Sequence, residues 1–178
     1  MSQALKQVEW CLKKAKKEIE TCKKLNKRPK HRGLLEVKTN LEESQNHLKK
    51  AEENLRFGLS LDPELYGYKI VESLFYCIYQ CFLSIAAKFG YESGNQTCTI
   101  SLIEYLKEQN KIDLDDKFIE IMQYKDEQRN KNHQSLIDLR EDYTYSVKTS
   151  VEKEVISEIV AECKEIIEKT KEIVYGKT

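Results

Sequence analysis

The stretch "LDPELYGYKIVESLFYCIYQCFLSIAAKFG", Leu61–Gly90, decides the fold class of this chain. It opens with Asp62 followed by Pro63, and this pair of an N-cap residue and a proline is typical of the first turn of a helix. It ends with Gly90, the residue type that most often follows the last turn. The residues between these signals are mostly apolar, so the stretch predicts a long helix at the centre of the protein.

The sequence on either side of this stretch predicts more helices and no strands. Apolar residues recur at spacings of three and four, whereas alternating runs and Asn-Gly hairpin turns are absent. The predicted helices span residues 3–25, 40–58, 65–89, 100–110, 116–143 and 151–174. Because mostly short loops join them, the predicted fold is an all-α, up-and-down antiparallel helical bundle.

Length and composition agree with one soluble domain. The chain has 178 residues, of which 40% are hydrophobic and 34% charged, with two prolines and six glycines. Glu72, Gln80 and Lys88 interrupt the most apolar run, so no membrane span is expected. The first twenty residues lack the apolar core of a secretory signal, and the expected location is therefore the cytoplasm.

Charge is distributed unevenly along the chain. The formal net charge is zero, but residues 1–33 hold eleven Lys or Arg against three Glu, a net of about +8. We expect a basic helix and loop, residues 1–33, packed on a bundle formed by residues 34–178, with Trp10 docked inward and the lysines outward. The loop "NKRPKHRG", residues 26–33, is either a solvated charge run or a phosphate-binding surface. Its candidate phosphate-binding residues are Lys27, Arg28, Lys30 and Arg32.

The six cysteines form no CxxC pair, and the chain shows no export signal. We therefore expect reduced thiols that pack as small core residues, with no metal site and no cofactor. Glycine-rich phosphate loops and the common hydrolase motifs are also absent.

Three segments, in this order, resemble the HEPN domain, especially its small single-domain prokaryotic and archaeal members. They are "HLKKAEENLRFGLSLDPELYGYKIVESLFYCIYQCFLSIAAKFGYES" at 47–93, "NQTCTISLIEYL" at 95–106 and "LIDLREDYTYSVKTSVEKEVISEIVAECKEIIEKTKEI" at 136–173. The resemblance implies a bundle of four to five helices in a family linked to RNA and nucleotide transactions. It also implies a homodimer, which we expect to form through the predicted helix of residues 116–143.

Ribonucleases of that family carry an arginine and, after four to six intervening residues, a histidine. The segment "RNKNH" begins like this motif, but only three residues separate Arg129 from His133. On a helix the two side chains would still share one face. Histidine can accept a proton and arginine can bind a phosphate, which is the chemistry of metal-independent RNA cleavage. The alternative is that His133 is a surface or dimer-contact residue.

A second alignment places the motif at "LREDY", where the noncatalytic branch of the family has an arginine followed by an Asp-Tyr pair. Arg140, Asp142 and Tyr143 would then occupy the motif position, or else form a salt-bridged helix end. Three functions therefore remain open. The chain is an RNA- or nucleotide-associated accessory protein, partnered with a nucleotidyltransferase in a toxin–antitoxin-like pair; an endoribonuclease that uses Arg129 and His133; or a non-catalytic interaction scaffold.

Overall fold

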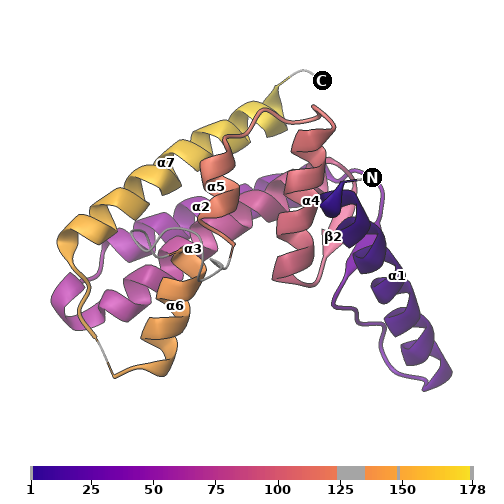
Figure 1. Ribbon diagram of the computed structural model, residues 1–178, viewed down its shortest axis with the longest axis horizontal. Coiled ribbons are helices and arrows are strands. Elements are labelled where there is room, and N and C mark those ends of the chain that lie inside the picture. Colours follow the sequence, from indigo (N-terminus) through magenta and orange to yellow (C-terminus); the bar gives the residue numbers. More distant parts are fainter. Residues whose placement is uncertain (1, 124–134, 148, 177–178) are drawn as a thin grey trace.

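The computed structural model describes residues 2–123, 135–147 and 149–176, and these residues are mostly helical (Figure 1). The elements in chain order are α1 (Gln3–Lys24), β1 (Leu34–Glu36), α2 (Leu41–Leu59), α3 (Pro63–Lys88), β2 (Tyr91–Ser93), α4 (Gln96–Glu108), α5 (Asp116–Glu120), α6 (Leu136–Tyr145) and α7 (Lys153–Tyr175). The all-α class predicted from the sequence is confirmed.

Helix α3 lies at the centre of the bundle, as its sequence predicts. The Asp62 carboxylate accepts a hydrogen bond from the amide of Glu64 at 2.9 Å, and Pro63 follows the cap. Gly90 ends the helix with a φ of +78°, a conformation that favours glycine. Side chains of α3 such as Phe75 and Phe82 are fully buried, and each such burial stabilises the fold by about 1.5–3 kcal/mol.

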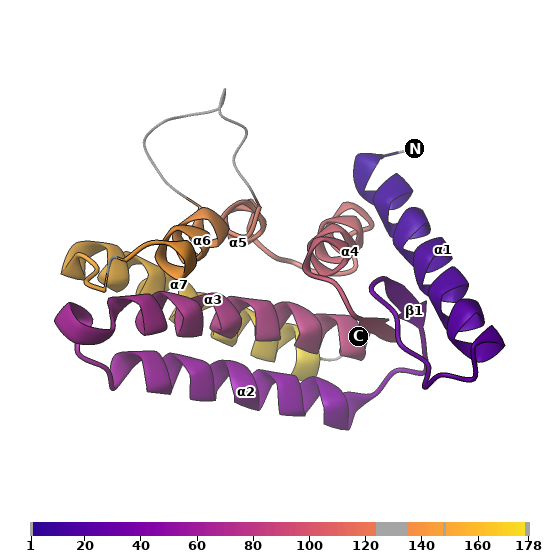
Figure 2. The same ribbon diagram turned by 90° about the horizontal axis from the view of Figure 1, so that it is seen from below.

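Helices α2, α6 and α7 pack around α3, and α2 also contacts α7. Figure 2 shows α2 and α3 running side by side along the length of the bundle. Two buried serines join them: the Ser44 hydroxyl donates to the Ser84 carbonyl at 2.8 Å, and the Ser84 hydroxyl donates to the Ser44 carbonyl at 2.7 Å. Because Ser44 is near the start of α2 and Ser84 near the end of α3, these bonds fix the antiparallel register.

Helix α3 is also long and apolar enough to cross a membrane by length and composition alone. However, 72% of its most apolar 18-residue window is buried inside the fold. Its hydropathy is therefore explained by its place in the core.

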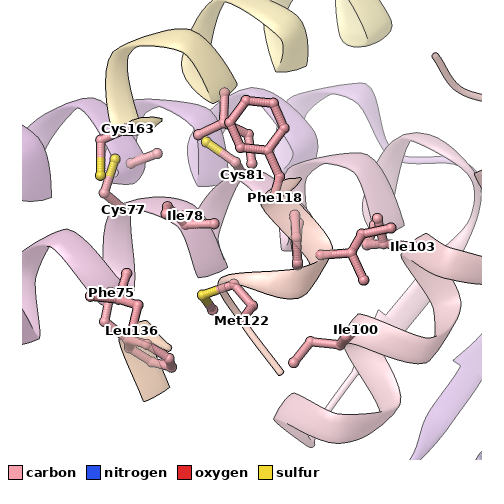
Figure 3. Packing of buried hydrophobic residues seen from close by; sticks show 14 of the residues in the cluster. Phe75, Cys77, Ile78, Cys81, Ile100, Ile103, Phe118, Met122, Leu136 and Cys163 are labelled. Carbon is pink, nitrogen blue, oxygen red and sulfur yellow. The ribbon is translucent and has the colours of Figure 1, made fainter. Parts of the chain in front are cut away.

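The prediction of one helix over residues 116–143 is wrong. Helix α5 ends at Glu120, and α6 begins anew at Leu136, with the Ser135 hydroxyl accepting from the amide of Asp138. The amide of Leu136 donates to the Ile121 carbonyl at 2.9 Å, so the start of α6 lies next to the residue that follows α5. The two short helices have different neighbours, because α6 packs against α3 whereas α5 contacts α4. Phe118, Met122 and Leu136 are all fully buried, and Figure 3 shows Leu136 beside Phe75 of α3, apart from Phe118. The physical reason for the break is that each short helix buries its own apolar residues.

The expectation that strands are absent is also wrong, although the sheet is small. Strands β1 and β2 pair antiparallel, with Leu34 opposite Ser93 and Glu36 opposite Tyr91. Each strand has three residues, which is too short to show the alternation by which strands are recognised. The sheet joins the segment after α1 to the segment after α3.

Helix α1 stands at one end of the bundle, where it contacts α4 and β1 (Figures 1 and 2). A disulfide between Cys11 of α1 and Cys98 of α4 holds it there. The expectation of six reduced cysteines is therefore wrong for this pair, because the fold brings together two residues that are 87 positions apart in sequence. Gly33 allows the close approach of β1, since a Cβ at Gly33 would lie 2.3 Å from the Cys11 carbonyl oxygen.

Candidate functional site

Of the two motif positions proposed from the sequence, "LREDY" lies within the described residues and "RNKNH" does not. Arg129 and His133 lie in residues 124–134, outside the described residues, so the structure does not test them as a catalytic pair. Arg140, Asp142 and Tyr143 lie on α6, within the described residues.

Arg140 contacts the core. Its guanidinium carbon lies 4.3 Å from the centroid of the Phe75 ring, and its Nη2 atom lies 3.8 Å from a carboxylate oxygen of Glu141. The side chain is only 22% exposed. A guanidinium over an aromatic face is a stabilising cation–π contact. Arg140 therefore has a structural contact that attaches α6 to α3.

Tyr143 attaches the end of α6 to the segment that leads into α7. Its hydroxyl donates a hydrogen bond to the Ser150 carbonyl at 3.0 Å. Burial raises the pKa of Tyr143, and the nearby carboxylates of Glu152 and Asp142 raise it further. The phenol therefore stays neutral to a higher pH than an ordinary tyrosine, and Asp142 is exposed beside it. These contacts give the "LREDY" segment a structural role.

Two buried thiols outside the disulfide, those of Cys77 and Cys81, are not poised for chemistry. Cys77 of α3 lies close to Cys163 of α7, and Cys81 lies one helical turn further along α3 (Figure 3). Hydrogen bonding with Cys163 raises the pKa of the Cys77 thiol, and burial raises that of Cys81. A neutral thiol is a poor nucleophile and a poor metal ligand. Among the described residues, no group of three or more His, Cys, Asp or Glu side chains is arranged to hold a metal ion.

The feature that stands apart is the N-terminal arm, which we define as residues 2–33: helix α1 and the loop that follows it. Helix α1 buries a narrow stripe of small residues at spacings of three and four. That stripe consists of Ala4, Val8, Cys11 and Ala15. The rest of the helix surface is mostly polar, with Leu5, Leu12 and Ile19 partly buried, and most of its lysines are exposed. The stripe therefore fixes the helix while leaving its basic side toward solvent.

The prediction that Trp10 docks the arm inward is wrong. Its side chain is 52% exposed, and the Lys14 ammonium lies 5.0 Å from the ring centroid. The spacing of residues in the sequence indicates this exposed position. Trp10 does not fall on the stripe of small residues, and its spacings of four, three, four and seven place it with four lysines. These are Lys6, Lys13, Lys14 and Lys17.

The loop supplies the remaining cations of the arm. The four candidate phosphate-binding residues, Lys27, Arg28, Lys30 and Arg32, are all exposed. The loop is held at its end: the Arg32 amide donates to the Glu18 carboxylate, and His31 Nε2 lies 3.1 Å from a Glu92 carboxylate oxygen. The His31 side chain is 7% exposed, so it belongs to this anchor. The loop thus presents its cations from a fixed backbone.

The cations of the arm differ from those of the bundle in their partners. No Lys or Arg of residues 2–33 forms an ion pair with any residue that the structure describes. In the bundle, by contrast, several lysines have carboxylate partners within 4 Å. They are Lys69, Lys107, Lys117, Lys169 and Lys171. The arm therefore keeps its net charge of about +8 without ion pairs between its Lys or Arg side chains and the described residues.

Comparison with known proteins adds no assignment to these observations. No protein-family model matches the chain, and a search of curated proteins finds no similar protein.

Proposed function

We propose that this protein is an RNA- or nucleotide-associated accessory protein of the HEPN type that binds polyanions through its N-terminal arm. The observation that carries the proposal is the net charge of about +8 over residues 1–33, with no ion pair to its Lys or Arg side chains among the described residues. Cations that a fold does not pair remain available to bind phosphates and to release their counterions.

The family part of the proposal rests on element order. The first resembling segment spans most of α2 together with α3, the second forms α4, and the third forms α6 and α7. A homodimer and a nucleotidyltransferase partner follow from the same resemblance and belong to the proposal. Sedimentation of the purified protein at micromolar concentration tests the homodimer, and a sharp monomer boundary would remove it.

Binding of labelled RNA, measured by fluorescence anisotropy over a range of salt concentrations, tests the proposal. The double variant Lys13→Glu/Lys17→Glu is expected to weaken binding by about tenfold or more at low salt and to reduce the slope of log K against log salt by about 1–2. Its matched control is Lys49→Glu/Lys164→Glu, which makes the same charge change at exposed positions of α2 and α7. Equal losses in the two variants would show that net charge, rather than the arm, determines binding.

The same mixtures separate binding from cleavage. The proposal expects intact RNA after incubation. RNA fragments that disappear in the His133→Ala variant would instead establish the endoribonuclease hypothesis, since removal of a general base slows such reactions by about 100-fold or more.

A further inference from the structure

Trp10 is the one tryptophan of the chain, and it lies on the basic side of α1 instead of in the core. An exposed aromatic ring forgoes the free energy that its burial would contribute to the fold. Trp10 and Leu25 are the large apolar residues that are exposed in the described part of the arm. Trp10 alone has a π-face, and it stands in the middle of the lysines.

The residues around Trp10 form a mixed surface of one ring and four ammonium groups. Lys6, Lys13, Lys14 and Lys17 are three, four or seven residues away on the same side of the helix. None of the three Glu of α1 has any of these spacings from Trp10. Lys14 already lies against the ring, so a phosphate bound by that ammonium would be held near the indole.

We propose that this surface binds single-stranded nucleic acid, with Trp10 as the ring on which a base stacks and the four lysines as the groups that bind the flanking phosphates. The inference rests on the proposed function and names its ligand class. Proteins that bind single strands combine a cationic track with aromatic rings, because every base has a π-face that is free to stack. In a duplex the bases stack on one another, so Trp10 has no base face to contact.

The burial pattern of α1 argues for this ligand over a membrane surface. A helix that lies in a lipid interface inserts a broad apolar face. In α1 the apolar face is the stripe of small residues, and it is buried against the rest of the fold. Only Trp10 among the residues of its lysine cluster is apolar. The charge of the cluster matches a phosphate backbone, and the single ring matches a base.

The unique tryptophan makes the test direct. Three ligands are compared with the full chain: an oligouridylate of about twelve nucleotides, a duplex of the same length, and inorganic polyphosphate. Stacking is expected to quench the Trp10 emission with oligouridylate, whereas polyphosphate binds without quenching it. Trp10→Leu is expected to weaken oligouridylate binding by about tenfold and to change duplex and polyphosphate binding by less than about twofold. Trp10→Phe, which keeps a π-face, is expected to recover most of the loss.

The outcomes separate this inference from the proposed function. If all three ligands bind and Trp10→Leu affects them equally, stacking is refuted while polyanion binding by the arm stands. If none binds, the proposed function fails and the inference fails with it. A blue-shifted Trp10 emission with vesicles of anionic lipid, and no change with oligouridylate, would assign the surface to a membrane instead. Circular dichroism of Trp10→Leu checks that α1 remains folded.

Discussion

The N-terminal arm and the helical bundle are held in place by different means. In the bundle, large side chains such as Phe75, Phe82 and Phe118 are fully buried, and several lysines are paired with carboxylates. The arm buries a stripe of small residues, and its disulfide to α4 provides a covalent attachment. Some cations of the bundle therefore have carboxylate partners, whereas the Lys and Arg side chains of the arm have none among the described residues.

The largest expected effect comes from the centre of the bundle. Phe82→Ala removes a fully buried ring from α3 and is expected to lower the free energy of unfolding by about 3–5 kcal/mol. Urea denaturation followed by circular dichroism measures this change. Tyr76→Ala on the same helix is the control, because Tyr76 is 38% exposed and loses fewer contacts. Similar losses in both variants would mean that α3 is not packed as described.

The second effect tests how the arm is attached. Cys11→Ala/Cys98→Ala removes a cross-link that spans 87 residues and is expected to cost about 2–4 kcal/mol. Hydrogen exchange should increase mainly in α1 and α4, while α2 and α3 stay protected. Cys22→Ala is the control, since Cys22 is a free cysteine at the far end of α1.

The disulfide also bears on the location of the protein. Disulfides persist mainly in oxidising compartments, so the predicted cytoplasmic location now has a specific test. Mass spectrometry of unreduced protein from its native cells would detect the linked peptides. If both thiols are free there, the sequence-based expectation of reduced cysteines holds in the cell and the attachment of α1 is weaker than the structure gives.

The sequence predicts best those features whose signals are local. Asp62, Pro63 and Gly90 mark the ends of α3 within a few residues, and the structure confirms them. The β1–β2 pairing and the Cys11–Cys98 disulfide join segments that are far apart in the chain, so no local sequence pattern predicts them. The helix predicted over 116–143 fails for a similar reason, because the hydrogen bond from the Leu136 amide to the Ile121 carbonyl joins residues that are too far apart in sequence for a local pattern to predict.

In the candidate site, too, the features with local sequence signals are predicted better than those that depend on packing. The exposed cations of the loop are predicted from composition alone, because a segment without apolar residues has nothing to bury. The spacing of Trp10 from the lysines of α1 predicts an exposed ring. The usual preference of aromatic rings for the core predicts the opposite, and here it is misleading. That Arg140 contacts Phe75 depends on how α6 packs against α3, which the sequence does not reveal.

A smaller effect compares lysines of the two regions directly. Lys171 of α7 lies 3.0 Å from the Glu52 carboxylate of α2 and 2.8 Å from that of Glu168. Lys171→Met is expected to lower stability by about 0–1 kcal/mol, as for other partly exposed ion pairs. Lys13→Met in the arm should leave stability unchanged or raise it slightly, because it removes repulsion among neighbouring lysines. Thermal denaturation at low and high salt measures both, and salt should diminish both differences.

The smallest effect concerns α4, the helix that contacts both the arm and α3. Partial burial raises the pKa of Glu104, and the negative charges of Glu108 and Asp116 raise it further. Since the folded state favours the protonated carboxyl, ionisation of Glu104 destabilises the fold as pH rises through its pKa. Glu104→Gln is therefore expected to raise the melting temperature slightly at neutral pH, and the gain should vanish as pH falls below about 4, where the wild-type carboxyl is also neutral. The exposed Glu53→Gln on α2 is the control. A Glu104→Gln variant that melts lower than wild type at neutral pH would contradict the raised pKa and show that the ionised carboxylate stabilises the fold.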